Sequence, residues 1–329
     1  MTKALTLIAP SIAPALHRAI ADRGAGWPQL ARIAGRGSIG EMPAPRAGLS
    51  TWQLALLDTL GVHDHDQYPS AAVMRTGDVG EPVRGFWLQL QPMHFMAGMD
   101  RLTAVELHGA SDVTRAELAE LEPTIAAHLR SAGMQLVTTS HDDWLVHCDR
   151  ALDVQTAPPE SAAHSLEQAM PRGGDAPALR RLMTELQMLL HEHPVNVARQ
   201  RRGLPEINAV WFHGAGEIRG LQRYALPQAF GDDLYLRGIY RLHDAEVTAA
   251  PTEARTLLAR LSSRAVAVVS TDDVDVLEAA WIAPLTRALA IGTLARLEVV
   301  VDRWRVTVAR HALLKFWRSA RTPAQWAAR

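Results

Sequence analysis

The feature that most constrains the fold is a set of short runs that are apolar on both faces and alternate with amphipathic helical patterns. Residues 3–9 form one such run, and residues 265–270 form another. A strand that is apolar on both faces is typical of a parallel sheet with helices packed on both sides. The second run is followed by a helical pattern over residues 277–289. We therefore predict an α/β fold, with a mixed sheet and helices on both faces.

The middle of the chain follows a different pattern, which indicates an inserted subdomain. Residues 86–155 contain short strand-like runs around one clear helix, Thr114–Ser131. Thr114 and Glu117 have the spacing of a capping box, which predicts the start of that helix. Residues 155–177 are rich in proline and glycine, as linkers are. The predicted domains are a discontinuous α/β core, 1–85 and 156–329, and an inserted α+β subdomain, 86–155.

Further elements follow from apolar periodicity and from turn residues. We predict an amphipathic helix over Thr51–Leu60 and a long loop over residues 62–85, which are rich in Asp, Gly, Pro and His. Ile207–Phe212 has the pattern of a strand, and we expect it to end in a glycine-containing loop, His213–Gly216. The remaining predictions are a helix over 178–191, a hairpin over 296–308 with its turn at Asp302 and Arg303, and a terminal helix from His311.

Composition and charge narrow the class of protein. Of the 329 residues, 48% are hydrophobic and 21% are charged, which is ordinary for a globular protein. The net charge is −1 without a block of one sign, so charge gives no argument for a nucleic-acid or membrane partner. A single cysteine, Cys148, suits a reducing compartment. We expect a soluble, cytoplasmic protein, and its oligomeric state is not readable from the sequence.

The densest polar constellation extends from His191 to Gly216 and indicates a site for an anionic small molecule. Arginine binds phosphate and carboxylate groups in a planar, bidentate manner, amides orient a ligand, and glycines let backbone N–H groups approach an anion. The glycine spacing departs from the dinucleotide fingerprint, which disfavours a nicotinamide or flavin cofactor. The candidate ligand-binding residues are His193, Asn196, Arg199, Asn208, Gly214 and Gly216.

The same residues also allow a purely structural interpretation. Asparagines cap backbone groups, glycines permit tight packing, and polar networks fix loops in the absence of any ligand. The two interpretations differ in what Arg199 contacts: an external anion in the first, and a protein group in the second. Both stay open at this stage.

Other candidate residues carry weaker signals. His63–Asp66 has metal-compatible residue types but lies in a loop, so a solvated loop is favoured over a metal site. Asp272, Asp273 and Asp275 follow a buried strand, where capping of the next helix is favoured over catalysis. Ser11 and Cys148 are candidate nucleophiles by residue type alone. The catalytic residues are therefore unknown, and no metal ligand is assigned.

The long polar segment also resembles a known family. Residues 189–199 and 203–216 are similar to a signature of archaeal-type cofactor-independent phosphoglycerate mutases, and are more similar still to shorter proteobacterial relatives of the RpfE regulatory type. Gln91–Phe95 resembles a proline-histidine motif of those relatives. The resemblance implies an alkaline-phosphatase-like α/β core that is interrupted by an insert.

The sequence departs from that family where active members hold two divalent metals. The first strand leads to Pro10 and Ser11 without an aspartate, and Trp281 and an apolar helix stand where a histidine-bearing segment is expected. We therefore expect a degenerate site that binds an anionic small molecule or a partner in a regulatory role. The alternatives are an active metal-dependent phosphoglycerate mutase or related phosphotransferase, with ligands such as His63, His65 and Asp272, and a purely structural interaction protein.

Overall fold

The structure, a computed structural model, describes residues 3–21, 27–46, 48–98, 102–107, 113–221, 223–315 and 317–327. By its internal contacts the chain forms two compact units. The first comprises residues 1–44, 51–63 and 223–329, and the second comprises residues 45–50 and 64–222. In the part of the chain that is described, no helix is long and apolar enough to cross a membrane.

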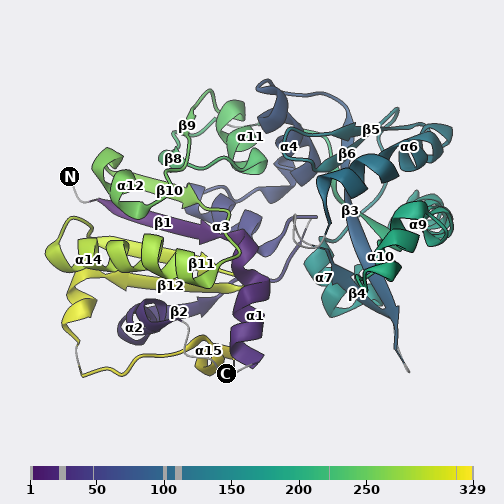
Figure 1. Ribbon diagram of the computed structural model, residues 1–329. Coiled ribbons are helices and arrows are strands. Elements are labelled where there is room, and N and C mark those ends of the chain that lie inside the picture. Colours follow the sequence, from purple (N-terminus) through teal and green to yellow (C-terminus); the bar gives the residue numbers. More distant parts are fainter. Residues whose placement is uncertain are drawn as a thin grey trace. The chain divides into compact units, whose positions relative to one another are not determined.

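The first unit is built on a seven-stranded mixed sheet with the strand order β2-β12-β11-β1-β10-β8-β9 (Figure 1). Its strands are β1 (Ala4–Ala9), β2 (Ser38–Glu41), β8 (Gln228–Phe230), β9 (Val247–Thr248), β10 (Arg264–Val268), β11 (Arg296–Val301) and β12 (Trp304–Ala309). Strands β11, β1, β10, β8 and β9 are parallel, whereas β12 and β2 are antiparallel to their neighbours. The predicted mixed sheet of an α/β fold is confirmed.

Helices pack on both faces of this sheet, as the fully apolar strands require. Leu5 and Leu7 of β1 point into a core shared with helices α1, α2, α12 and α14, and α3 packs against β1 and β11. The helices are α1 (Ala13–Ala21), α2 (Pro28–Arg36), α3 (Thr51–Leu60), α11 (Leu234–Leu242), α12 (Ala254–Arg260), α13 (Val274–Val276), α14 (Ala283–Ile291) and α15 (Pro323–Ala327). Short 3-10 turns η1 (Pro10–Ile12) and η4 (Arg310–Leu314) and the π-helical segment η3 (Leu277–Ile282) complete the unit.

The second unit is built on a five-stranded antiparallel sheet around one long strand. Its strands are β3 (Phe86–Ala97), β4 (Leu102–Glu106), β5 (Met134–Thr138), β6 (Trp144–Cys148) and β7 (Ala209–Gly216). The first half of β3 pairs with β6, its second half pairs with β4, and β7 also pairs with β3. The helical elements are η2 (His65–Gln67), α4 (Ser70–Val79), α6 (Arg115–Ser131), α7 (Pro159–His164), α8 (Leu166–Ala169), α9 (Ala176–His191) and α10 (Pro194–Arg201).

Several predicted elements are confirmed in detail. Helix α6 begins at a capping box in which the Thr114 hydroxyl accepts from Glu117 N and the Glu117 carboxylate accepts from Thr114 N. Helix α3 has the predicted bounds. The C-terminal hairpin turns at Asp302, which adopts a positive φ of 51°.

Three predictions about local structure are wrong. Residues 62–85 are not one loop, because Ala71, Ala72 and Val73 form a buried side of helix α4 among the polar residues. Strand β7 does not end at Phe212 but continues to Gly216, because it follows the edge of β3. No long helix starts at His311: the chain forms the 3-10 turn η4, and α15 begins only at Pro323.

The second unit also extends beyond the residues 86–155 that were expected as the insert. Ile207–Phe212 was placed in the α/β core, yet β7 pairs with β3 and its side chains belong to the core of the second unit. The sheet of the first unit instead pairs β1 with β10 and β11. The pairing partner of a strand is a non-local property, so apolar pattern alone did not reveal it.

Candidate functional site

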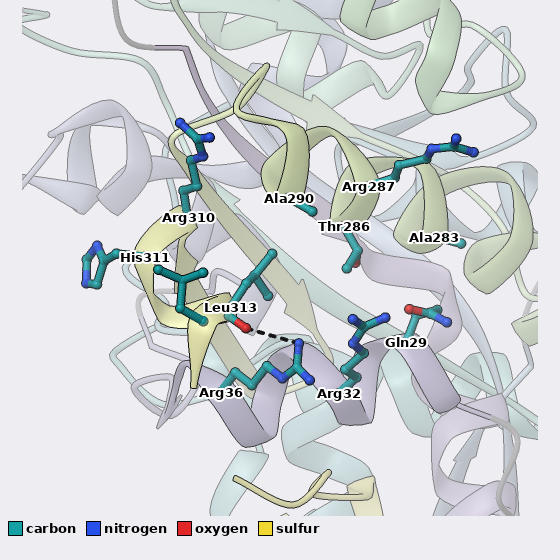
Figure 2. A pocket seen from close by; sticks show the side chains of 11 residues that line it. Gln29, Arg32, Arg36, Ala283, Thr286, Arg287, Ala290, Arg310, His311 and Leu313 are labelled. Atoms are coloured by element: carbon teal, nitrogen blue, oxygen red, sulfur yellow. Dashed lines mark hydrogen bonds between the residues drawn. The ribbon is translucent and has the colours of Figure 1, made fainter. Parts of the chain in front are cut away.

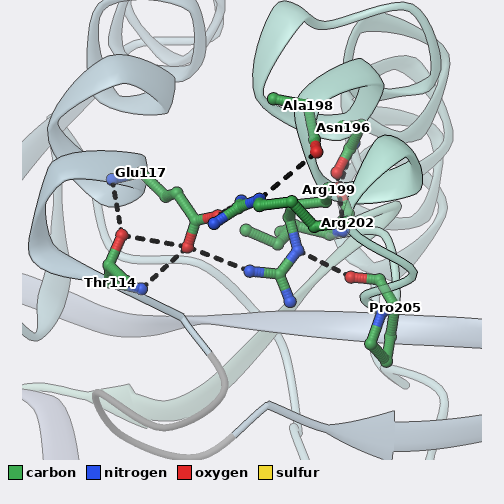
Figure 3. A network of polar contacts seen from close by, with 8 residues as sticks. Thr114, Glu117, Asn196, Ala198, Arg199, Arg202 and Pro205 are labelled. Carbon is green, nitrogen blue, oxygen red and sulfur yellow. Dashed lines mark hydrogen bonds and ion pairs between the residues drawn. The ribbon is translucent and has the colours of Figure 1, made fainter.

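Arg199 lies in a buried polar network of the second unit and faces protein groups (Figure 3). Its Nη1 lies 2.9 Å from Glu117 Oε2, and its Nε donates to Pro205 O at 2.6 Å. The side chain is 1% exposed. Arg202, which is half-exposed, reaches the second oxygen of Glu117 at 2.5 Å. Glu117 is therefore the counterion of Arg199, in the place that the sequence suggested for a ligand anion.

The same network controls the protonation of Glu117. Burial by itself would raise the pKa of this carboxyl, but hydrogen bonds from the Thr114 backbone and from Arg202, together with the charge of Arg199, lower the pKa to about 2. Glu117 is thus ionised at neutral pH, as a buried arginine requires. The pair fixes helix α6 to the chain around α10.

The two asparagines of the polar segment bind backbone groups. Asn196 donates from Nδ2 to Leu190 O and Ile207 O, and its Oδ1 accepts from Ile207 N at 2.7 Å. Asn208 exchanges two hydrogen bonds with the backbone of Phe95 in β3. Each side-chain amide replaces a missing backbone partner, so these residues hold the connection between α10 and β7 in place.

His193 is the N-cap of helix α10. Its Nδ1 accepts a hydrogen bond from Val195 N at 3.3 Å, and its Nε2 lies 3.4 Å from the Thr124 hydroxyl. The contacts of His193, Asn196 and Arg199 place them around α10. Gly214 and Gly216 instead lie beside Ser70 and Pro69, which none of those three residues contacts. The six predicted residues therefore do not form one site.

Gly214 and Gly216 let the start of helix α4 approach strand β7 closely. Gly214 has a φ of 63°, and a Cβ on it would stand 2.9 Å from Ser70 Cβ. A Cβ on Gly216 would stand 2.6 Å from Pro69 Cβ. Real Cβ atoms do not tolerate such separations, so both positions require glycine. The group that approaches these glycines is a helix of the same chain, which is the tight packing expected by the structural interpretation.

A cavity of about 530 Å³ opens beside Gly216. We call it the Gly216 cavity. Its charged lining residues are Arg46, Asp66 and Arg172, and its polar ones include Gln155, Thr156 and Gln168. Two guanidinium groups against one carboxylate leave a positive excess, which favours an anionic or zwitterionic ligand. The volume lies within the usual range of small-molecule sites, about 300–1,000 Å³.

The polar groups of the Gly216 cavity are held by local hydrogen bonds. Thr156 Oγ1 accepts from Ala215 N at 3.3 Å, and Arg172 Nη2 donates to Gln168 O at 3.3 Å. Arg46 Nη2 lies 2.9 Å from His65 Nδ1. Arg46 and Arg172 are exposed, so their remaining N–H groups are available to a molecule in the cavity.

Sequence reasoning missed both cavity arginines: Arg172 lies in the stretch interpreted as a linker, and Arg46 lies in a stretch to which no element was assigned. Arg46 follows Pro45, and Arg172 follows Pro171 before Gly173 and Gly174. A Pro-Arg pair in a proline- and glycine-rich segment combines a stiff backbone with a planar cation. That combination is the signal that could have identified them.

The carboxyl edge of the parallel strands in the first unit is where α/β sheets most often bind ligands. Asp233 and Asp273 follow β8 and β10, and each caps a helix: Asp233 accepts from Leu236 N, and Asp273 from Asp275 N and Val276 N. Asp302, after β11, lies 3.0 Å from His17 Nε2. The capping role favoured for the 272–275 segment is confirmed for Asp273.

Other residues that the sequence suggested by residue type are buried or contact neighbouring side chains. Cys148 is buried in β6, and burial raises the pKa of its thiol to about 12, so it is not a thiolate at neutral pH. Asp64 accepts a hydrogen bond from Gln67 at 2.6 Å, and His65 lies beside Arg46. In the described ranges, no group of three or more His, Cys, Asp or Glu side chains is placed to hold a metal ion.

Comparison with known proteins finds a partial relative. Over 71 residues the chain is 35% identical to the 2,3-bisphosphoglycerate-independent phosphoglycerate mutase of Methanothrix thermoacetophila. This stretch represents 22% of this chain and spans 18% of the length of that mutase. No family model matches the chain.

Two solved structures align with nearly the whole chain at low sequence identity. They are the cofactor-independent phosphoglycerate mutase from Thermoplasma acidophilum (16% identity, 98% of this chain, 94% of that chain, TM-score 0.44) and the PH0037 protein from Pyrococcus horikoshii (14% identity, 99% of this chain, 92% of that chain, TM-score 0.46).

Proposed function

We propose that this chain is a phosphoglycerate mutase-like regulatory protein, comparable to the RpfE type, that binds an anionic small molecule in the Gly216 cavity. The observation that carries the proposal is the position of Gly216, a residue of the mutase-like signature, in a cavity with Arg46 and Arg172. Gly216 and Pro69, which pack against each other, form part of the wall, and the two arginines supply the charge. The proposed binding thus uses Arg46 and Arg172 in place of Arg199, which the sequence suggested.

The metal pair that active members of the superfamily hold does not fit the described side chains at the sheet edge. Oδ1 of Asp273 already accepts two backbone N–H groups, and Asp302 is 3.0 Å from His17. A two-metal centre needs several carboxylate and imidazole ligands that converge on one point. We therefore derive no phosphoryl-transfer step, and the proposed role is recognition of the anion.

Calorimetric titration of the full chain with 3-phosphoglycerate tests the proposal. After treatment with a chelator, binding should persist, because arginines and not a metal hold the anion. Arg172→Lys keeps the charge but loses the planar fork, and should weaken binding about tenfold, which corresponds to about 1.4 kcal/mol. Arg130→Lys, an exposed arginine on α6 outside the cavity, is the matched control and should bind as the unchanged protein does.

Three results would overturn the proposal. One is equal weakening by Arg172→Lys and Arg130→Lys, which would show a general charge effect. Another is robust mutase turnover with added manganese, magnesium or zinc that a chelator abolishes, because that result identifies an active metal-dependent enzyme. The third is complete absence of binding to 3-phosphoglycerate, inorganic phosphate and other phosphorylated metabolites, which would favour the purely structural alternative.

A further inference from the structure

A second cavity, of about 700 Å³, lies within the first unit and is lined by arginines (Figure 2). We call it the arginine cavity. Helix α2 contributes Arg32 and Arg36, helix α14 contributes Thr286 and Arg287, and the turn η4 contributes Arg310. On α2 the lining positions 29, 32 and 36 are three and four residues apart, and on α14 positions 283, 286 or 287, and 290 follow the same spacing, so each helix offers one face to the cavity.

The walls of the arginine cavity are held together by a buried carboxylate. Glu278, in η3 just before α14, accepts hydrogen bonds from Gln29 N and Leu30 N at the start of α2, both at 3.0 Å. These bonds satisfy backbone N–H groups that the first turn of a helix leaves free. The cavity is therefore preorganised: α2 is tied to the segment that leads into α14 before any ligand enters.

The charge of the arginine cavity is one-sided. Four arginines and His311 line it, and none of the lining residues that the structure describes is a carboxylate. Within the described ranges, none of Arg32, Arg36, Arg287 and Arg310 has an ion pair with a carboxylate, in contrast to Arg199 and its Glu117. Like charges gathered in a hollow repel one another and concentrate anions there.

Fold stability explains some of these arginines but not all. Arg36 Nη1 donates to Leu313 O at 3.2 Å. The Arg310 guanidinium lies over Gly292 at the carboxyl end of α14, where the helix dipole favours a cation. Arg32 is exposed in the cavity wall and has no hydrogen bond to any described residue. Arg287 is likewise exposed, without a hydrogen bond or ion pair to any described residue, so the fold gives neither Arg32 nor Arg287 a structural role.

Thr286 supplies an independent sign of a ligand. Thr286 is 4% exposed, and its hydroxyl has no hydrogen-bond partner among the described residues. In Figure 2 the Thr286 side chain extends from α14 toward the side of the cavity from which Arg32 rises. A buried hydroxyl without a partner is costly, and an acceptor oxygen of a ligand would remove that cost.

We propose that the arginine cavity binds a small metabolite that carries two or more phosphate charges, such as a nucleoside diphosphate. One phosphate would contact Arg32, Arg36 and the Thr286 hydroxyl, and the next would contact Arg310 near the rim. Planar guanidinium groups match phosphate oxygens in pairs, and the hydroxyl donates a further hydrogen bond. Ala290 and Leu313 offer an apolar wall to the remainder of the molecule.

The shape of the site favours a small molecule over a nucleic acid. The basic residues line a hollow of about 700 Å³, within the range of small-molecule pockets. The whole chain has a net charge of −1, without the excess of cations that backbone recognition of nucleic acid uses. The inference does not depend on the Gly216 cavity, which belongs to the second unit.

The test is titration of the full chain with ADP, pyrophosphate and tripolyphosphate at constant ionic strength, followed by calorimetry and by thermal unfolding. We expect saturable binding that tightens from inorganic phosphate to pyrophosphate. Arg32→Lys should weaken pyrophosphate binding about tenfold or more. Arg237→Lys, an exposed arginine on α11 away from the cavity, is the matched control and should leave the affinity unchanged.

Thr286→Val separates ligand binding from folding. Valine has nearly the same shape but no unsatisfied hydroxyl, so the free protein should unfold at the same or a higher temperature, while pyrophosphate binding weakens. A structural role alone predicts altered unfolding with unchanged affinity, which would overturn the proposal. The proposal also fails if pyrophosphate, tripolyphosphate and ADP do not bind at millimolar concentration, if Arg237→Lys weakens binding as much as Arg32→Lys, or if only DNA or RNA binds. Arg172→Lys should not affect this site, so failure here is distinguishable from failure at the Gly216 cavity.

Discussion

Replacing Glu117 with glutamine tests whether Arg199, in the polar segment His191–Gly216, is paired with a protein carboxylate. Glutamine keeps the shape and the oxygen that accepts from Thr114 N, but removes the negative charge. Arg199, 1% exposed, would then retain a buried charge with the glutamine oxygen and Pro205 O as neutral acceptors and without a counterion. Arg202 is half-exposed and can turn to water, so its lost contact contributes little.

The expected destabilisation follows from the burial of Arg199. Removing one partner of a buried ion pair costs about 3 to 5 kcal/mol, because the other charge is left uncompensated. The second unit has about 165 residues, and for domains of this size each kcal/mol shifts the midpoint of thermal unfolding by about 2–4 °C. We therefore expect Glu117→Gln to lower the melting temperature of this unit by roughly 6 to 20 °C.

Thermal unfolding as a function of pH makes the test specific. The pKa of Glu117 is about 2 in the folded protein, below its ordinary value of 4.5, so its stabilising contribution is complete above pH 4.5 and is lost as the pH falls toward 2. Glu117→Gln should remove this part of the acid sensitivity. Glu120→Gln, an exposed residue on the same helix, is the control and should change neither the midpoint nor its pH dependence.

The double variant Glu117→Gln, Arg199→Met completes the argument. Because it removes both buried charges, it should be more stable than Glu117→Gln alone. If Glu117→Gln unfolds within about 1 °C of the unchanged protein, or if the double variant loses the sum of the single effects, Arg199 does not depend on Glu117 and the structural interpretation of the segment is refuted.

Three further predictions concern other positions. Gly214→Ala should destabilise by about 1 to 3 kcal/mol in chemical denaturation, from a positive φ and a clash with Ser70, whereas Gly203→Ala, at a positive φ but in open space, should cost less. Burial lowers the pKa of His213 to about 3, so the free energy of unfolding should fall as the pH drops from 6.5 toward 3. In His213→Leu, the free energy of unfolding measured with urea should depend less on pH in that range. Cys148 should react with a thiol reagent at pH 8 only as fast as the protein unfolds, and rapid labelling of the native protein would contradict its burial.

The elements that the sequence predicted well are those with local causes. The capping box of Thr114 and Glu117, the hairpin turn at Asp302 and the apolar runs of β1 and β10 each depend on neighbouring residues. Helix α4 was missed because its buried alanines lie among Ser, Thr, Gly and Asp, which are typical of loops.

The candidate sites were harder to predict, because they depend on contacts between distant segments. Arg199 has the appearance of an anion ligand until Glu117, 82 positions earlier, is placed against it. The arginine cavity joins α2 to residues 283–314 and leaves no local motif in either segment. Hydrophobic periodicity indicates only which face of each element is apolar, so it does not predict which charged residues of distant helices lie together.

The position of β1 has a consequence for biosynthesis. Ile8 of β1 pairs with Val268 of β10 and Val300 of β11, about 260 and 290 positions later in the chain. At roughly 5–20 residues per second, a ribosome needs on the order of 13 to 50 seconds to supply the first of these partners. Once it has left the exit tunnel, the apolar strand Ala4–Ala9 lacks the neighbours that cover its hydrogen-bonding edges for the rest of that interval, while the residues of the second unit are synthesised and can form their own sheet. This apolar strand therefore waits for both of its pairing partners, and a nascent chain should bind a holding chaperone at β1 until β10 and β11 have been synthesised.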